Sequence, residues 1–471
     1  MRFSVRAFLP ENRHWSAASW EFAILSVFLP NALYLAMMIY FCPIRNFQIG
    51  LLAMLVLLGT ILGRWSFYFV MIFAMSLDAL LVASVYFQMP VAMFFDATKF
   101  VSTLQVQHSA MYVMVFGAVI MCFFATNVVV QRAKRRRSEM SLYPFAFCVM
   151  LMVFADTIAN TTPQKMQEVI SVAVEPFSAV DDTATTYADL GVVVTSSEQP
   201  NLLVVIVEGL GAFSNSESQE LVWGPLLGKK VSSRYDVYTG NVLYSGSTST
   251  AEIRELCNLF ADYRDLRDIE HLDCLPNRAK EVGYKTAAFH AFTGEFFERV
   301  HWYPKIGFEN IFFLENRAGL NEHVPISHCG TTFRGMCDAD VAGSVEAFLL
   351  SESSGAKFAY WLTLNSHKPV GRHEVPDRLN CWDGGVFDDQ ELCRMAEHWL
   401  NISHLVSDIA MNPLLRDTEI LLVGDHQPPL FTRHGRRQFQ DERVAWLHLS
   451  PRNSSENHFD LATINAAFFI H

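Results

Sequence analysis

The feature that most constrains the fold of this chain is a series of apolar runs in its first 160 residues. Five runs reach or approach the length that crosses a membrane, at about residues 21–42, 48–63, 66–88, 111–130 and 143–160. A helix needs about 20 apolar residues to cross a hydrocarbon core about 30 Å thick. A cleavable signal peptide would show one such run and a cleavage site, whereas several long runs follow one another here. The sequence therefore predicts a helical membrane domain of about five spans over residues 1–160.

Basic residues near the span ends predict the orientation of this domain. Lysine and arginine in short loops are retained on the cytoplasmic side of a membrane. The densest basic run, Lys134 to Arg137, lies between the fourth and fifth spans, and three further arginines precede residue 14. With both segments inside, Arg64 also lies on an inside turn, and Arg45 falls on the outer side. We therefore expect everything after about residue 161 to be extracytoplasmic.

The rest of the chain differs in charge from the membrane domain. Residues 1–160 contain 11 Lys and Arg against 6 Asp and Glu, whereas residues 161–471 contain 25 against 42. An acidic soluble part, with a basic run confined between apolar segments, argues against a nucleic-acid partner. Residues 161–200 combine a helical piece near Met166 to Val174 with a stretch rich in Ser, Thr and Asp, which predicts a juxtamembrane helix and a linker.

The cysteines agree with this topology. Cys42, Cys122 and Cys148 lie in or beside the apolar runs, where a free thiol behaves as a small apolar residue. An even set of six lies in the soluble part, and such a set in an oxidising compartment favours up to three disulfides. Many pairings are possible, but the close neighbours along the chain predict the pairs Cys257 with Cys274, Cys329 with Cys337, and Cys381 with Cys393.

Residues 201–471 alternate between predicted strands and predicted helices. The apolar, β-branched run Leu202 to Val207 is typical of a strand buried on both faces. The alternation predicts an α/β domain with a mostly parallel central sheet that helices cover on both faces. We expect further strands at 284–290, 357–367 and 418–426, and helices at about 249–259, 275–282, 339–350 and 389–411.

The predicted strands end in side chains that can carry chemistry. One histidine at a strand end is usually structural, but four strand ends bring carboxylates and imidazoles to the same edge of the sheet, where α/β proteins bind ligands. Carboxylates and imidazole together suit Zn²⁺ or Mn²⁺. Three such ligands would leave a position for a hydroxyl, whose pKa a divalent cation lowers by several units. The residues at these ends are Glu208, His290, His367, Asp425 and His426.

The segment YSGSTSTAEIRELC, from Tyr244 to Cys257, is the natural source of such a hydroxyl. Ser245 and Gly246 predict a turn, and the residues that follow favour a helix, so Thr248 falls near a helix N-terminus. Backbone amides at that position favour an anion such as a phosphate. Taken alone, the segment is more typical of an ordinary Ser/Thr helix cap than of a catalytic hydroxyl.

An ordered set of motifs resembles the lipoteichoic-acid synthase and phosphoethanolamine transferase branch of the alkaline phosphatase/sulfatase superfamily. The motifs are VVIVEG, GSTSTAE, FHAFTGEFFERVHWYPKIGF, TLNSHKP and GDH, behind five apolar runs, so that the resemblance covers about the whole chain. It implies a multi-pass protein of the bacterial inner membrane, with a sulfatase-like catalytic domain in the periplasm. It further implies a divalent metal, Zn or Mn, a phospholipid donor, and an envelope glycan or lipid A-type acceptor.

The resemblance also implies roles for individual residues. Thr248 matches the nucleophile of the family, although alignment on the S-T-A triplet of the phosphoethanolamine branch would choose Thr250. His367 matches a histidine that can donate or accept a proton. Phe297 stands where the family usually has tryptophan. The implied metal ligands are Glu208, Thr248, Asp425 and His426, and the implied substrate-side residues are His290, Phe297 and Arg299; His434, in an arginine-rich segment, is a further candidate for lining the site.

The implied reaction is transfer of a phospho-alcohol headgroup through a covalent phosphothreonine. The cysteine framework favours phosphoethanolamine as the group transferred, whereas the nucleophile motif and the His-to-Arg spacing resemble the phosphoglycerol-transferring enzymes. A metal-dependent phosphodiesterase is an alternative, because transfer and hydrolysis differ only in what attacks the intermediate. A sulfatase would need a C/S-x-P-x-R motif, which STSTAEIRELC lacks. Loss of a metal ligand would favour an inactive scaffold, but all four ligand positions are filled here.

Overall fold

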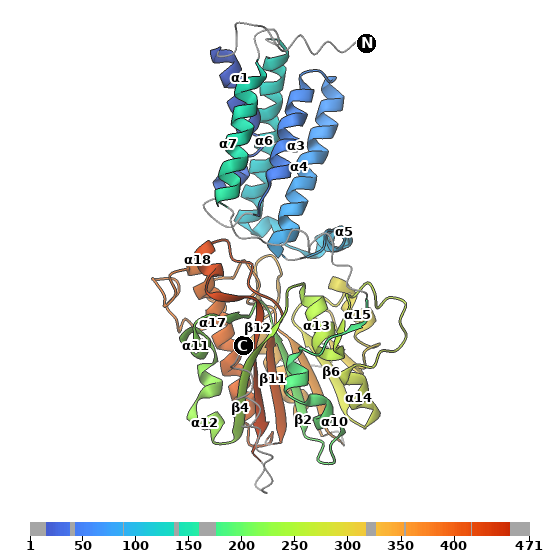
Figure 1. The fold of residues 1–471 in the computed structure, drawn as a ribbon. Helices are drawn as coiled ribbons and strands as arrows, with labels where there is room; N and C mark the ends of the chain where they lie inside the picture. Colours follow the sequence, from blue (N-terminus) through green and yellow to red (C-terminus); the bar gives the residue numbers. More distant parts are fainter. Residues whose placement is uncertain are drawn as a thin grey trace, which may run out of the picture.

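A computed structural model of the protein describes residues 16–37, 43–87, 89–135, 141–159, 176–316, 326–352, 355–415 and 417–452. A helical bundle is followed by an α/β domain, and the two parts lie end to end (Figure 1). The helix predicted near Met166 to Val174 lies outside the described residues.

Apolar helices build the first part. Among the described residues, three helices are long and apolar enough to cross a membrane, and two apolar helices, α1 (Ala17–Phe28) and α3 (Asn46–Gly59), are shorter, at 12 and 14 residues. Pro30 interrupts the first predicted span, and the Asn31 side chain there donates to the carbonyl of Val27 at 2.8 Å. The long helices are α4 (Arg64–Phe87), α6 (Ala110–Arg135) and α7 (Leu142–Ala159); the shorter ones include α1, α2 (Ala32–Met37) and α3.

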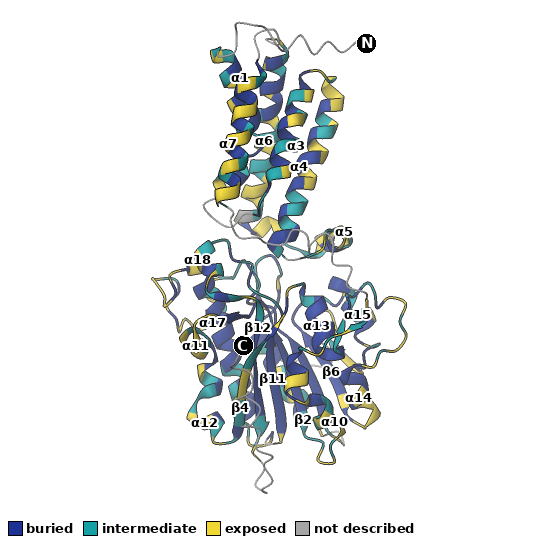
Figure 2. Cartoon of the chain, in the orientation of Figure 1, coloured by how far each residue is buried: buried dark blue, intermediate teal, exposed yellow. Residues whose placement is uncertain are grey.

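The direction of the helices agrees with the orientation predicted from the basic residues. The start of α1 and the end of α6, with Arg132, Lys134 and Arg135, lie at the end of the bundle far from the α/β domain (Figure 1). The ends of α4 and α7 face that domain. Exposed residues run along the outer faces of the bundle helices, where lipid would surround them (Figure 2).

Arg45, which the sequence placed on the outer side, is buried among the helices. Its Nε donates to Oδ1 of Asp78 at 3.1 Å, and its backbone amide donates to Oδ2 of Asp156 at 2.7 Å. The guanidinium lies over the ring of Tyr34, 3.4 Å from the ring centre. Charges are costly in apolar surroundings, so that a buried arginine and buried aspartates stabilise one another. This cluster accounts for two carboxylates that interrupt otherwise apolar runs.

The α/β domain is built on an eight-stranded sheet with the order β3-β12-β11-β2-β10-β6-β7 and with β4 paired to β12. Strands β11, β2, β10, β6 and β7 are parallel, whereas β12 runs antiparallel to β11, β3 and β4. The sheet is therefore mixed, with a parallel centre. Its strands are β2 (Asn201–Val207), β3 (Gly211–Phe213), β4 (Tyr235–Leu243), β6 (Lys285–His290), β7 (Asn310–Phe312), β10 (Lys357–Leu362), β11 (Thr418–Gly424) and β12 (Phe439–Pro451).

Helices cover both faces of this sheet, as predicted (Figure 1). The central strands β2, β10 and β11 consist almost wholly of buried residues (Figure 2). One group of helices comprises α11 (Ser216–Leu227), α12 (Lys229–Ser232), α16 (Asp338–Leu349) and α17 (Gln390–Met411), and the other comprises α10 (Leu190–Thr195), α13 (Thr248–Cys257) and α14 (Leu275–Glu281).

One predicted strand is shorter than the sequence suggested. The run 357–367 was expected to end at His367, but β10 ends at Leu362. The amide of Thr363 still donates to the carbonyl of Ile206 in β2 at 3.0 Å. The ladder stops after it, because the amides of Leu364 and Asn365 donate to the carboxylate of Asp338 at 3.0 and 2.8 Å. His367 is therefore carried by a loop beyond the strand.

The segment that joins α4 to α6 packs into the α/β domain. It contains α5 (Val91–Ala97) and two short 3-10 helices, η2 (Thr98–Thr103) and η3 (Val106–His108). Met93 and Phe100 belong to the hydrophobic core of the α/β domain, and the Phe100 ring lies 5.5 Å from that of Phe296. Asp96 accepts a hydrogen bond from Arg267 at 2.9 Å. The bundle is thus joined to the α/β domain by packing as well as by the chain.

Candidate active site

Three potential metal ligands converge at the carboxyl edge of the parallel strands. Glu208 follows β2, and Asp425 and His426 follow β11, the strand paired with β2. The ligand atoms of these residues all lie within 4.8 Å of one another. Nε2 of His426 is 3.5 Å from Oε1 of Glu208 and 3.4 Å from Oδ2 of Asp425. The three side chains therefore surround one point.

The local contacts prepare these side chains for a cation. Nδ1 of His426 lies 2.9 Å from the carbonyl of Gln427, which can only accept a hydrogen bond, so that Nε2 keeps its lone pair. The amides of Gly209 and His426 donate to Oδ1 of Asp425 at 2.6 and 2.7 Å, which leaves Oδ2 facing the centre. Burial and the adjacent Asp425 carboxylate raise the pKa of Glu208. Two buried carboxylates and an imidazole lone pair fit a divalent metal.

Thr248 is the hydroxyl that reaches this point. It is the first residue of α13, and its Oγ1 donates to Oδ2 of Asp425 at 2.8 Å. Thr250 is 8% exposed, and its hydroxyl lies 3.1 Å from the hydroxyl of Ser247, the N-cap of α13. Ser249 is fully buried, with its hydroxyl 3.2 Å from that of Ser247. The helix therefore uses two of its hydroxyls internally and presents Thr248 to the ligands.

His290 and His367 share the arrangement seen at His426. Nδ1 of His290 lies 3.1 Å from the carbonyl of Leu362, and Nδ1 of His367 lies 2.8 Å from that of Lys368. Burial lowers the pKa of His367 to about 4, and burial together with the Arg299 guanidinium holds the pKa of His290 well below its usual range. Both imidazoles are therefore neutral at pH 7 and offer Nε2 as an acceptor.

Arg299 is held by a carboxylate that the sequence analysis did not single out. Its Nε and Nη2 donate to Oε2 of Glu252 at 3.0 and 2.7 Å, and both side chains are buried. Tyr360 donates to Oε1 of Glu252 at 2.9 Å, and Tyr303 donates to the same oxygen. Glu252 lies one helical turn after Thr248 on α13, and this spacing is the signal that could have indicated it.

Phe297 lies two residues before Arg299 in an unusual turn. Phe297 and Glu298 both have left-handed backbone angles, with φ of 55° and 54°. Such residues persist where their surroundings hold them. Arg267 binds both carboxylate oxygens of Glu298 at 2.8 and 2.6 Å, and Phe100 packs 6.3 Å from the ring of Phe297. The segment between α4 and α6 therefore supports the turn that presents Phe297.

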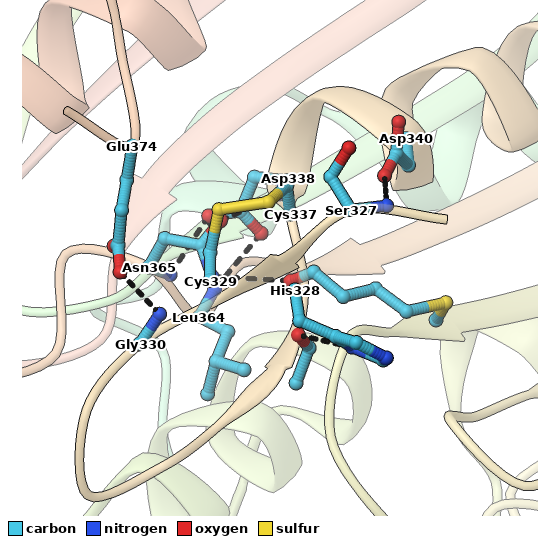
Figure 3. The surroundings of a disulfide bond; sticks show 12 residues. Ser327, His328, Cys329, Gly330, Cys337, Asp338, Asp340, Leu364, Asn365 and Glu374 are labelled. Atoms are coloured by element: carbon cyan, nitrogen blue, oxygen red, sulfur yellow. Dashed lines mark hydrogen bonds between the residues drawn. A yellow bond between two sulfur atoms is a disulfide. The ribbon is translucent and has the colours of Figure 1, made fainter. Parts of the chain in front are cut away.

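The three predicted disulfides are present, linking Cys257 with Cys274, Cys329 with Cys337, and Cys381 with Cys393. The first joins the end of α13 to the start of α14. The second closes the loop before α16, beside the Asp338 carboxylate that fixes the backbone at Leu364 and Asn365 (Figure 3). Two of the disulfides thus stabilise segments that flank Thr248 and His367.

A cavity of about 1040 Å³ contains this site. Thr248, Glu208 and His426 line it together with the substrate-side residues predicted from the sequence, namely His290, Phe297, Arg299 and His367. His434 does not line this cavity. It is exposed, with Nε2 3.6 Å from Oδ2 of Asp388, and lines a separate surface hollow. Its neighbours Arg433, Arg436 and Arg437 line the main cavity instead.

The Sulfatase family model matches residues 200–460, which include every residue of this site. The chain belongs to the sulfatase family. The match begins one residue before β2 and covers all eight strands of the sheet of this sulfatase-family domain. None of the curated proteins matches the chain.

Solved structures resemble this sulfatase-family chain at low sequence identity. The lipoteichoic acid synthase LtaP from Listeria monocytogenes is 14% identical over 57% of this chain and 72% of its own, with a TM-score of 0.40. The phosphoglycerol transferase GacH from Streptococcus pyogenes, in complex with sn-glycerol-1-phosphate, is 15% identical over 60% and 80%, with a TM-score of 0.39. The C-terminal periplasmic domain of EptC from Escherichia coli, in complex with Zn, is 13% identical over 54% and 73%, with a TM-score of 0.36.

Proposed function

We propose that this protein transfers a phospho-alcohol headgroup from a membrane phospholipid to an envelope glycan or a lipid A-type glycolipid. Phosphoethanolamine is the favoured headgroup. The catalytic domain would lie in the periplasm, held at the inner membrane by residues 1–160. The proposal depends on one observation: the Thr248 hydroxyl, 2.8 Å from Asp425, opens into a cavity that continues to the membrane helices α4 and α6.

The side chains of the site can perform such a transfer. Glu208, Asp425, His426 and Thr248 would hold Zn²⁺ or Mn²⁺, which when bound lowers the pKa of a coordinated hydroxyl and offsets phosphate charge. Oγ1 of Thr248 attacks the donor phosphorus as the bond from phosphorus to the diacylglycerol oxygen breaks, and diacylglycerol leaves with a proton. An acceptor hydroxyl then attacks the phosphothreonine, and Thr248 recovers its proton.

The neutral histidines suit the second half of this reaction. Nε2 of His367 can accept the proton of the attacking acceptor hydroxyl. Nε2 of His290 can accept a hydrogen bond from the hydroxyl or ammonium group of the headgroup, but as a neutral acceptor it does not offset phosphate charge. Arg299, already paired with Glu252, orients the phosphate through its remaining N–H groups.

Phosphoglycerol from phosphatidylglycerol is the second candidate for the transferred group. The three disulfides favour phosphoethanolamine, because the cysteine framework is what the sequence shares with that branch. The GSTSTAE motif and the spacing from His290 to Arg299 favour phosphoglycerol. A metal-dependent phosphodiesterase would use the same phosphothreonine with water as the acceptor.

Incubation of the purified full chain with labelled phosphatidylethanolamine and phosphatidylglycerol distinguishes these functions. Mass analysis of the peptide that carries Thr248 should show the increment of phosphoethanolamine, with release of diacylglycerol. The mass increment of phosphoglycerol would instead identify phosphatidylglycerol as the donor. Steady release of the free phospho-alcohol without an acceptor would indicate a hydrolase. No diacylglycerol from either lipid, in folded and metal-loaded protein, would contradict the proposal.

A further inference from the structure

The cavity that contains Thr248 does not end within the catalytic domain. It extends from the ligand cluster past Tyr86, at the end of α4, to residues that lie well inside the membrane bundle. Its two ends differ in chemistry, because carboxylates, imidazoles and arginines line one end and aliphatic and aromatic side chains line the other. The bundle residues that line it are Ser76, Ala79, Leu80, Tyr86 and Phe87 of α4, and Tyr112, Val115, Phe116 and Val119 of α6.

These bundle residues form one stripe on each helix, and together we call them the acyl groove. On α6 the lining positions 112, 115, 116 and 119 follow the spacing of a single helix face. On α4 the positions 76, 79, 80, 86 and 87 do the same over three turns. Phe116 is 70% exposed, although it lines the cavity. The groove is therefore open along its side to whatever surrounds the bundle.

The depth of the acyl groove matches one leaflet of a bilayer. From Ser76 to Phe87, α4 rises about 16 Å at about 1.5 Å per residue. Half of a hydrocarbon core about 30 Å thick is about 15 Å. The groove starts at the end of α4 that faces the catalytic domain, so that it spans the outer half of the membrane (Figure 1).

Positive charge lies where the groove meets the catalytic cavity. Arg433, Arg436 and Arg437 line the cavity on and after α18 (Arg433–Arg436), at the face of the domain next to the bundle (Figure 1). Lys368, whose Nζ donates to the Tyr86 hydroxyl at 3.0 Å, is paired with Glu391 at 2.7 Å, so that the arginines provide the positive charge here. An apolar groove, a basic junction and a phosphate-suited site follow one another in the order of the parts of a phospholipid.

We propose that the acyl groove binds the acyl chains of the donor phospholipid in the outer leaflet, while its headgroup lies at Thr248. The donor then reaches the site sideways from the membrane, and diacylglycerol leaves by the same path. This inference rests on the proposed function for the identity of the lipid, but the groove itself can be tested by binding alone.

The first test is photo-crosslinking of the full chain in phosphatidylcholine nanodiscs with phosphatidylethanolamine that carries a diazirine in the middle of one acyl chain. We expect crosslinks on the peptides that contain 76–87 and 112–119. Crosslinks confined to α7, or spread evenly over the bundle, would contradict the proposal that the acyl groove binds the acyl chains. Because no turnover is needed, this result stands even if neither lipid proves to be a donor.

The second test fills the groove. Ala79→Trp and Val115→Trp should lower kcat/KM for long-chain phosphatidylethanolamine about tenfold or more, relative to kcat/KM for a water-soluble phosphoethanolamine ester without acyl chains. Ile72→Trp and Met114→Trp, which lie exposed on the same helices outside the groove, are the matched controls. Equal losses on both substrates, or unchanged ratios in the groove variants, would contradict acyl-chain binding there.

Discussion

The Thr248 hydroxyl donates to Oδ2 of Asp425 at 2.8 Å, across 177 residues of sequence. Asp425 lies at the end of a central parallel strand, and Thr248 begins a helix on one face of the sheet. The contact places the nucleophile candidate on the same oxygen that faces His426. Of the hydroxyls at the start of α13, it therefore distinguishes Thr248 from its neighbours.

Replacement of Thr248 should separate catalysis from folding. Thr248→Ala should lower turnover by about a thousandfold or more, because no other hydroxyl of α13 faces Asp425, while metal binding and the melting temperature stay near wild type. Thr250→Ala is the matched control. It should keep turnover and lose about 1 kcal/mol of stability, because the hydrogen bond between the hydroxyls of Thr250 and Ser247 is lost. Retained turnover in Thr248→Ala would move the nucleophile to Thr250 or Ser249.

Metal removal should cost both activity and stability. A ligand present at about 100 times its Kd stabilises a folded protein by about 2.7 kcal/mol. Dialysis against a chelator should therefore lower the melting temperature and abolish turnover, and Zn²⁺ or Mn²⁺ should restore both. In Asp425→Asn the added metal should no longer raise the melting temperature, whereas His434→Ala, remote from the ligands, should respond as wild type does. If the chelator left the melting temperature of the wild type unchanged, this result would contradict the proposed metal site.

The pair formed by Arg299 and Glu252 should behave as a buried ion pair. Glu252→Gln leaves the arginine without its countercharge, and such a loss costs about 3–5 kcal/mol. The double variant Glu252→Gln with Arg299→Gln should be more stable than Glu252→Gln alone, since neither charge remains unpaired. Chemical unfolding of the four proteins in one cycle gives the coupling. Additive losses would show that the two side chains do not interact.

The buried Asp338 should make stability depend on pH. Burial raises the pKa of Asp338 to about 7 from the ordinary 3.8. Between these values the folded state binds a proton that the unfolded state does not, so that stability falls as pH rises from about 4 through 7, by on the order of a few kcal/mol. The melting temperature should fall over this range in the wild type and change less in Asp338→Asn. Asp340→Asn, which removes a charge from the same helical turn, should keep the wild-type slope.

Much of the fold was predictable because it depends on local sequence patterns. Apolar runs, strand ends and close cysteine neighbours each depend on short stretches, and the structure confirms the α/β sheet and the three disulfides. The antiparallel strand β12 and its partner β4 were not predicted, since β4 is partly exposed and lacks the apolar run of a central strand. The point where β10 ends depends on Asp338, which lies before β10 in the chain. Its carboxylate accepts the hydrogen bonds of the Leu364 and Asn365 amides, which therefore do not pair with a neighbouring strand.

The candidate site was predictable only in part, for a related reason. Glu208, Asp425 and His426 end adjacent parallel strands, so that sheet topology alone brings them together. The partner of Arg299 is Glu252, whose spacing from Thr248 places it on the same face of α13, but the pairing with Arg299 follows only from the tertiary packing. The arginines around His434 line the cavity, although His434 itself does not. No periodicity in the sequence reports which side of a four-residue helix faces inward.

Met93 and Phe100, in the segment between two membrane helices, are buried in the core of the catalytic domain. In the function proposed above, this packing sets the height of Thr248 above the bilayer, and the protein samples its donor in two dimensions. The quantity that governs its rate is then the number of donor molecules per unit area of leaflet, not their amount per volume. Diluting the assay with buffer should leave the rate per protein unchanged, while diluting the donor with inert lipid should slow it in proportion.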